Sequence, residues 1–400
     1  MVIAFVMDDV GTSTNGTAIT ARRYAQALRA QGHEVRIVAH GATGPYGYPL
    51  EERHIPVVSA VSARQSFLFA RPDNEVFDRA FAGVDIIHVF LPFKLGGAAV
   101  SYARAHGIPV SAAFHLQPEN VTYNAWLGGS SAVCSLIYRL FRRWLYDGVR
   151  HVHCPSAMIA AQLRDHGYTN ELHVISNGVP KEYHPAPATH PFEDGYFHIL
   201  TVGRLAPEKD QATLVRAVAL SRHADRIMLH VAGSGALRPH LRRLGAKLPN
   251  GIDIAFHEPD DLIELIRSCD LYVHSAKADI EAISCMEAFS CGVVPVIATS
   301  PRSATSQFAL MPESLYPVGD EQALADRIDW WLEHPEARAQ ASVEYVAEGD
   351  RYRISACVGR FVDMEREAID DDLVGYGRQS EVGRARVPAV SGGGTEDGLR

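Results

Sequence analysis

Short apolar runs and helical patterns alternate along the first half of the chain. An apolar run at 2–9 is followed by a turn and by a helical pattern at 18–32, and the same order returns between 84 and 115. Gly32 ends the first helical pattern ahead of the next apolar run. Strands separated by helices of this length predict right-handed crossovers and a parallel sheet covered on both faces.

A proline-rich stretch at 184–195 interrupts this alternation, and its composition predicts a linker. The alternation restarts at 197 and ends in a long helical stretch with expected breaks near Pro335 and Gly349. After 370 the chain has little apolar periodicity and a run of three glycines, which is typical of disorder.

These patterns predict an α/β protein of two Rossmann-like, doubly wound parallel-sheet domains that face a common cleft. Ligands bind such sheets at the carboxyl ends of the strands, so we expect the functional side chains in loops that follow strands. The expected divisions are an N-terminal domain at 1–183, a C-terminal domain at 184–345, a helix at 346–369 that returns to the N-terminal domain, and a disordered tail at 370–400.

The composition is that of a globular protein, with 47% hydrophobic and 21% charged residues. Asp8 and Asp9 interrupt the first apolar run before a signal peptide can form, and no apolar run approaches the roughly 20 residues of a membrane span. We therefore expect a cytoplasmic protein. The formal charge of −9 argues against general nucleic-acid binding, because that mode requires a basic face.

The six cysteines form no CxxC pair and lie mostly in apolar strings, so we expect buried thiols in a reducing compartment. His151 and His153 lie beside Cys154, and the alternation of a strand places both imidazoles on one face. Since no second cluster completes a set of four zinc ligands, we interpret these residues as structural and expect no metal site.

The segment at 202–210 follows an expected strand and precedes an expected helix, and it carries Arg204 and Lys209. Two cations on one loop can neutralise a diphosphate; the alternative is a solvated basic loop. Gly233 and Gly235 follow the next strand of this domain. Glycines there let backbone N–H groups approach a phosphate, although an ordinary tight turn explains them equally well.

Asp279 and Glu287 lie eight positions apart, and Glu287 is expected to open a helix that ends at Gly292. A carboxylate at that position suits the dipole of a helix N-terminus, and it also suits a ribose diol, from which it can accept two hydrogen bonds. Glu281 lies in the same loop, so the pattern leaves open which acidic residue has which role.

Three segments together resemble the nucleotide-sugar domain of retaining family 4 glycosyltransferases, which have the GT-B fold. They are GRLAPEKD, the GSGALRPHL turn, and an acidic residue followed after seven positions by Glu287-Ala288 and then CGVVPVIA. The similarity extends over roughly residues 1–345. The chain departs from the family twice: Asp279 stands where the family usually has Glu, and SPRSATSQFAL replaces a Gly-Gly turn.

The resemblance implies a nucleotide-sugar donor and no required cofactor. In the family, the positions of Arg204 and Lys209 bind the donor diphosphate, the position of Glu287 holds the ribose, and the position of Asp279 contacts the donor sugar. Glu281 remains a second candidate for a donor contact.

The N-terminal half has two candidate positions. The turn with Gly16 and Thr17 corresponds to the family's glycine-rich loop; the alternative is a plain Asn-Gly turn in which Thr17 or Thr20 caps a helix. His115 ends an expected strand, where the family commonly has a His that contacts the donor sugar. A purely structural histidine is the alternative.

We therefore expect retaining transfer of a hexose, with UDP-glucose as the expected donor, and without a protein nucleophile. Arg204 and Lys209 would stabilise the leaving diphosphate, while His115 and Asp279 hold the sugar in a closed cleft. A GT-B nucleotide-sugar epimerase and a non-catalytic nucleotide-sugar-binding module are the alternatives from other classes.

The acceptor prediction depends on a helical stretch at 135–147. Its apolar stripe includes Phe141 and Trp144, and Arg139, Arg142 and Arg143 lie off the stripe, as in helices at membrane surfaces. The alternative is a helix that buries this stripe in the domain core. The TFH-like segment at 113–115 and the HCPS segment at 153–156 also resemble bacterial diacylglycerol glucosyltransferases, which implies a lipid acceptor such as diacylglycerol and peripheral attachment at the inner face of the membrane. A soluble sugar or sugar-phosphate acceptor remains the alternative.

Overall fold

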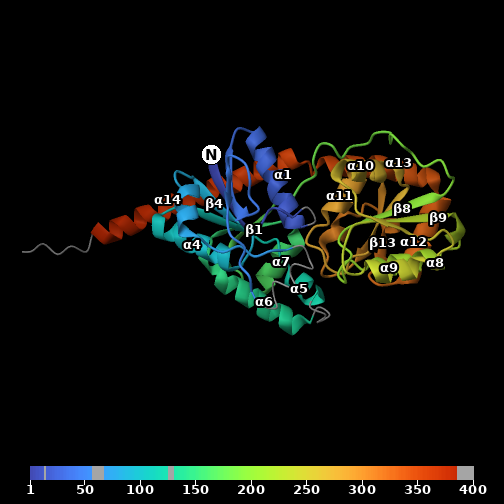
Figure 1. The fold of residues 1–400 in the computed structure, drawn as a ribbon, viewed down its shortest axis with the longest axis horizontal. Helices are drawn as coiled ribbons and strands as arrows, with labels where there is room; N and C mark the ends of the chain where they lie inside the picture. Colours follow the sequence, from blue (N-terminus) through green and yellow to red (C-terminus); the bar gives the residue numbers. More distant parts are fainter. Residues whose placement is uncertain (13–14, 56–66, 125–129, 385–400) are drawn as a thin grey trace, which may run out of the picture.

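The computed structural model describes residues 1–12, 15–55, 67–124 and 130–384, with side chains described as far as Leu373. Two α/β domains lie next to one another, and the last helix runs back along the first domain (Figure 1).

The described part of the N-terminal domain has one sheet in the order β3-β2-β1-β4-β5-β6-β7, and every pairing in it is parallel. The order reverses between β1 and β4. The strands are β1 (Val2–Asp9), β2 (Glu34–His40), β3 (Gly47–Pro49), β4 (Ile86–Val89), β5 (Val110–Ala113), β6 (His151–Cys154) and β7 (Glu171–Val174). The helices are α1 (Gly16–Ala30), α3 (Asn74–Ala80), α4 (Lys94–His106), α5 (Pro118–Asn124), α6 (Ser131–Trp144) and α7 (Ala157–Asp165).

The C-terminal domain has a second parallel sheet, in the order β10-β9-β8-β11-β12-β13, which reverses between β8 and β11. The strands are β8 (Phe197–Val202), β9 (Ile227–Ala232), β10 (Asp253–Ala255), β11 (Leu271–His274), β12 (Val294–Thr299) and β13 (Leu315–Pro317). The helices are α8 (Gln211–Leu220), α9 (Arg238–Gly245), α10 (Pro259–Ser268), α11 (Ile283–Ser290), α12 (Glu321–Glu333) and α13 (Pro335–Asp350). The prediction of two doubly wound domains is confirmed.

Local sequence signals explain where several helices begin and end. Asn15 caps α1, because its side-chain oxygen accepts a hydrogen bond of 3.0 Å from the backbone N–H of Thr17. The alternative of a cap by Thr17 or Thr20 is therefore wrong in the capping residue: the cap lies one residue before the helix, where the N–H groups of the first turn can reach it. The breaks expected near Pro335 and Gly349 are confirmed, since α13 lies between them.

The last helix, α14 (Ile354–Arg384), packs on the N-terminal sheet and completes its core. Phe361 lies edge-on to the rings of Phe5 and Tyr24. In the same core the hydroxyl of Ser111 donates to both oxygens of Glu365, at 2.7 and 2.8 Å, and these two residues are fully buried. The helix is therefore an integral part of the N-terminal domain.

α14 also extends into the segment where a disordered tail was expected, from residue 370 to Arg384. Asp371 lies in this extension, and its carboxylate is 3.1 Å from Arg150 and 2.9 Å from His151. The pattern of apolar residues missed this part of the helix because these contacts are polar. Residues 385–400 of the expected tail lie outside the described residues.

The chain crosses between the domains twice, and the two crossings are hydrogen-bonded to each other. The N–H of Val179 donates to Tyr352 at 2.7 Å, and the N–H of Ile354 donates to Val179 at 3.0 Å. Gly178 has a φ of +74°, and a Cβ on it would lie 2.7 Å from the Cα of Ile354. Only glycine fits this close approach.

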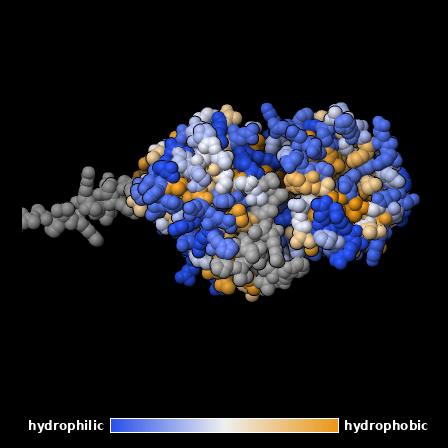
Figure 2. Space-filling view, viewed as in Figure 1, coloured by the Kyte–Doolittle hydropathy of each residue, from blue (hydrophilic) through white to orange (hydrophobic). Residues whose placement is uncertain are grey.

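All six cysteines are free and buried, as expected. Among the described residues, no helix is long and apolar enough to cross a membrane. Figure 2 shows a mostly hydrophilic surface over both domains, with apolar residues scattered across it.

Candidate active site

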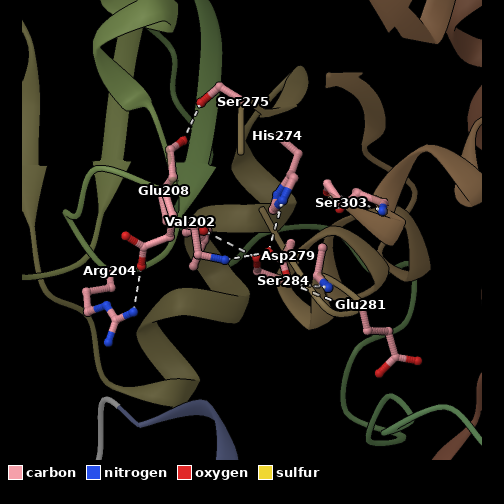
Figure 3. A network of polar contacts seen from close by, with 12 residues as sticks. Val202, Arg204, Glu208, His274, Ser275, Asp279, Glu281, Ser284 and Ser303 are labelled. Atoms are coloured by element: carbon pink, nitrogen blue, oxygen red, sulfur yellow. Dashed lines mark hydrogen bonds and ion pairs between the residues drawn. The ribbon is translucent and has the colours of Figure 1, made fainter. Parts of the chain in front are cut away.

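The loops that follow β8 and β11 lie on either side of the point where the strand order of the C-terminal sheet reverses. Lys209 from the first loop forms an ion pair with Asp279 from the second. The carboxylate of Asp279 also lies 3.2 Å from Nε2 of His274 and accepts a 2.9 Å hydrogen bond from the N–H of Ala282 (Figure 3). Burial opposes its ionisation, but Lys209 and His274 outweigh that effect and hold the pKa of Asp279 well below its usual range.

Arg204 lies in the same loop as Lys209 and is paired with a buried carboxylate. Its Nη2 donates to Glu208 at 2.6 Å, and Glu208 is only 1% exposed. The other carboxylate oxygen of Glu208 accepts from Asn124 on α5 at 3.2 Å, so this cluster faces the N-terminal domain. Arg204 is a third exposed and keeps unused donors, since its Nε has no hydrogen-bond partner among the described residues.

Gly233 and Gly235 pack against the backbone of the Arg204 loop. A Cβ on Gly233 would lie 2.0 Å from the carbonyl oxygen of Gly203, and one on Gly235 would lie 2.4 Å from that of Leu205. The N–H of Leu205 in turn donates to Ser234 at 2.8 Å. These glycines are required by the backbone contact alone, whether or not a phosphate binds there.

We expect Gly233→Ala to lower the free energy of unfolding by about 1–3 kcal/mol, because the backbone of the Arg204 loop must shift to admit the methyl group. Urea denaturation measures the change. Gly359→Ala is the control, since a Cβ there meets no atom within 4 Å. Equal stability of the two variants would contradict this packing.

Glu287 lies in the middle of α11, which begins at Ile283, so the expectation that Glu287 opens the helix is wrong. The helix begins earlier because Asp279 accepts hydrogen bonds from the two backbone N–H groups just before it. Glu287 pairs with Nη1 of Arg23 on α1 at 2.7 Å, and the Arg23 guanidinium lies over the ring of Tyr183. The expected ribose carboxylate is therefore held by an arginine of the other domain.

Glu281 is directed away from Asp279 (Figure 3), toward the connection between the domains. It is 1% exposed, and one oxygen accepts a 2.9 Å hydrogen bond from the N–H of Asn177. Burial raises the pKa of Glu281 to about 8. Of the two acidic candidates in this loop, only Asp279 lies beside Lys209.

The raised pKa of Glu281 predicts a pH dependence of stability. Between its ordinary value of 4.5 and about 8, the folded protein keeps a proton on Glu281 that the unfolded chain has lost, so stability falls as the pH rises through this range. Relative to wild type, Glu281→Gln should gain stability from pH 5 to pH 8, by up to about 1.4 kcal/mol per pH unit. Denaturation at several pH values measures this, with the exposed Glu344→Gln as control. Parallel pH profiles for wild type and Glu281→Gln would contradict it.

The N-terminal domain contributes His115, which follows β5. Its ring stacks on Phe90, and burial together with His153 and His88 lowers its pKa far below the usual value. The imidazole is therefore neutral, and its buried Nε2 has no hydrogen-bond partner among the described residues. Such a nitrogen can exchange a hydrogen bond with a hydroxyl group.

Gly16 and Thr17 form the start of α1. The N–H of Thr17 is already used by the Asn15 cap, and a Cβ on Gly16 would meet no described atom within 4 Å. Nothing in this local packing requires glycine at position 16.

Arg302 contacts the N-terminal domain and was not singled out by the sequence pattern. It lies in the segment that replaces the family's Gly-Gly turn, and its Nη1 donates to the hydroxyl of Tyr123 on α5 at 3.2 Å. Its carbonyl accepts a 3.1 Å hydrogen bond from Gln117. The one available signal was an arginine in the loop that follows the buried strand β12.

The expected apolar stripe at 135–147 is split between two faces of α6. Phe141 and Leu145 are buried with Cys134 and Tyr138, whereas other members of the stripe face solvent. Leu136 is 48% exposed and Trp144 54% exposed. The helix thus has one face in the core and a second, partly apolar face outside.

Comparison with known proteins agrees with this geometry. The family description "Glycosyltransferase Family 4" matches residues 14–183, and "Glycosyl transferases group 1" matches residues 185–344. A GDP-mannose-dependent alpha-mannosyltransferase of Corynebacterium glutamicum is 26% identical over 88% of this chain and 82% of its own. A second enzyme of that name, from Mycolicibacterium smegmatis, is 26% identical over 74% of this chain and 79% of its own.

Among solved structures, sucrose-phosphate synthase of Thermosynechococcus elongatus covers 92% of this chain and 99% of its own, with a TM-score of 0.74 and 18% identity. This likeness shows the fold, in which two doubly wound domains face each other. The two family matches together extend from residue 14 to residue 344. The chain belongs to the family 4 glycosyltransferases, has the GT-B architecture, and is a hexosyltransferase that uses a nucleotide-sugar donor.

Proposed function

We propose that the protein transfers a hexose with retention of anomeric configuration, from a nucleotide sugar to a lipid acceptor at a membrane surface. One observation carries the donor side: Arg204, Lys209 and Asp279 meet at the carboxyl ends of β8 and β11, beside α5 of the facing domain. Cations in that place suit the charge that develops on a departing diphosphate.

The cluster supports leaving-group stabilisation without a protein nucleophile. An ammonium has three donors and a guanidinium five, so Lys209 and Arg204 can bind phosphate oxygens and keep their contacts with Asp279 and Glu208. Those carboxylates hold the cations in place before the donor arrives, which lowers the cost of ordering them. We assign the sugar contacts to Asp279 and His115 and the ribose contact to Glu287.

We propose GDP-mannose as the first donor to test. The three curated relatives compared are each named a GDP-mannose-dependent alpha-mannosyltransferase. UDP-glucose, which the sequence resemblance favours, is the second donor. The structure of the Anabaena protein HepE with UDP-glucose shows that a protein of this fold binds that donor.

A panel of nucleotide sugars tests the donor. A donor that binds the folded state raises the melting temperature, and the rise grows with its concentration above Kd. We expect GDP-mannose to raise the melting temperature most. In a separate assay with an added lipid acceptor, we expect turnover and a product whose NMR spectrum shows an α-linkage. Inversion of the anomeric centre would contradict the retaining proposal, and epimer formation without acceptor would indicate an epimerase. Donor binding with no turnover on any acceptor would indicate a binding module.

The outer face of α6 supports the lipid acceptor. Leu136 and Trp144 lie two turns apart on it, with Leu140 between them and the exposed Arg139 and Arg143 alongside. Apolar residues can enter the boundary of a bilayer while neighbouring arginines contact anionic headgroups. Apolar side chains are visible at the lower edge of the N-terminal domain, where α6 lies in Figure 1 (Figure 2).

Vesicle binding tests the acceptor side. We expect sedimentation with vesicles that contain anionic lipid at low salt, and loss of most binding in Trp144→Ala and in the double variant Arg139→Glu, Arg143→Glu. Val343→Ala is the control, because Val343 is 67% exposed on the other domain. No binding by the wild type, together with turnover on a soluble sugar or sugar phosphate, would replace the lipid acceptor with a soluble one.

A further inference from the structure

A cluster of ionisable side chains lies at the amino ends of β6 and β7, away from the loops that form the candidate active site. The two strands are parallel, with His151 opposite Glu171 and His153 opposite His173. Alternate residues of a strand share a face, so His151, Glu171 and His173 lie on the same side of the sheet. That side is the one against which α14 packs.

The distances within this cluster fit ligands of one small cation. Nδ1 of His151 lies 3.0 Å from Nε2 of His173, and 3.9 Å from Oε2 of Glu171. The ligand atoms of all three residues lie within 4.8 Å of one another. Two nitrogens that each bind zinc at about 2.05 Å at a tetrahedral angle are about 3.3 Å apart, so the observed pair needs to open by only a few tenths of an ångström.

The surrounding groups orient these atoms. The second nitrogen of His151 lies 2.9 Å from Asp371 on α14, and Nδ1 is directed at His173. Arg150 holds Oε1 of Glu171 at 2.7 Å, while Oε2 lies toward the imidazole.

The C-terminal domain contains a similar histidine pair that lacks the third ligand. Nδ1 of His198 lies 3.0 Å from Nε2 of His230, and each outer nitrogen faces a carboxylate, of Asp194 and Asp253. In the described residues no further carboxylate completes that pair into a group of three. The His151 cluster also differs in access, because a cleft of about 220 Å³ between β7 and α14 is lined by His173.

We propose that His151, His173 and Glu171 bind one divalent transition-metal ion, with water as a fourth ligand and Asp371 orienting His151. Two imidazoles and a carboxylate form a donor set that suits zinc. Asp371 belongs to α14, so the ion joins the edge of the N-terminal sheet to the last helix. The site stabilises the fold and is separate from sugar transfer.

The test uses the full-length protein without a histidine tag, stripped with a chelator and dialysed. Titration calorimetry with Zn²⁺ and the metal content measured after gel filtration should each give one ion per chain. Added Zn²⁺ should also raise the melting temperature of the protein. Co²⁺ should give the absorption spectrum of a tetrahedral site. Mg²⁺ should give neither effect, because it prefers oxygen ligands.

His173→Asn and Glu171→Gln should abolish stoichiometric binding, and Asp371→Asn should weaken it by roughly 10- to 100-fold. Glu171 is about half exposed, so its variant is expected to fold even if His173→Asn does not. His230→Asn is the matched control and should bind as wild type does. Absence of one bound Zn²⁺ in the wild type, or unchanged binding in Glu171→Gln, would overturn the site and leave a hydrogen-bonded histidine pair only.

Discussion

Arg204→Ala is expected to lower kcat by roughly 100- to 1,000-fold with the preferred nucleotide sugar. The guanidinium is the group of this loop best able to bind two phosphate oxygens at once, and its effect increases as negative charge develops on the leaving group. KM for the donor should change less than kcat. Steady-state kinetics with saturating acceptor measures both.

Two further variants separate this effect from loss of structure. Removing Arg204 leaves Glu208 buried without its cation, so the melting temperature must be measured as well. Arg204→Lys keeps a positive charge beside Glu208 but lacks the planar pair of donors. It should fold normally and still have a kcat well below that of the wild type. Arg216→Ala is the control, because Arg216 lies on α8, the helix that follows the loop, and forms an exposed ion pair with Glu321. Near-normal turnover of Arg204→Ala would show that the loop does not bind the diphosphate.

Glu365→Ala is expected to lower the free energy of unfolding by about 3–5 kcal/mol, the largest effect that we expect outside the active site. The substitution removes the partner of the Ser111 hydroxyl and of Nδ1 of His88, which lies 2.8 Å from the same carboxyl group. All three side chains are fully buried, so no water replaces the lost hydrogen bonds. Urea denaturation monitored by circular dichroism gives the value.

Two comparisons make this prediction specific. Glu365→Gln retains an oxygen and an NH₂ group at the same place. Its free energy of unfolding should fall by less than half as much as that of Glu365→Ala. Arg366→Ala, one residue further along α14, removes an exposed pair with Asp363 and should change stability by less than about 0.5 kcal/mol. If Glu365→Ala lost no more free energy of unfolding than Arg366→Ala, α14 would not be anchored through the Glu365 carboxyl group.

The parts of the structure that the sequence predicts are those set by short-range periodicity. The alternation of strands and helices predicts both sheets, and a loop after a strand places Arg204 and Lys209 at the carboxyl ends of the C-terminal sheet without any long-range information. The breaks at Pro335 and Gly349 follow equally directly from residue type. The resemblance to a known family adds roles to these residues, because a pattern of charges alone also fits a solvated loop.

The parts that the sequence does not predict depend on segments distant along the chain. Arg23 meets Glu287, and Arg302 meets Tyr123, only because the two domains face each other in one orientation. The sequence pattern did not connect His151 with His173 for the same reason. The signal was present in the alternation of ELHV at 171–174, but which strand lies beside β6 is a property of the sheet order.

The return of α14 has a consequence for synthesis on the ribosome. The C-terminal domain is one uninterrupted stretch of chain, whereas the N-terminal domain is assembled from both ends of the sequence. Domains made first generally fold first during translation. Here the N-terminal sheet leaves the exit tunnel without Phe361 and Glu365, so its core stays incomplete until α14 has also left the tunnel. The domain synthesised second is therefore the first that can finish folding, and the earlier domain presents an uncovered apolar surface to chaperones during that interval.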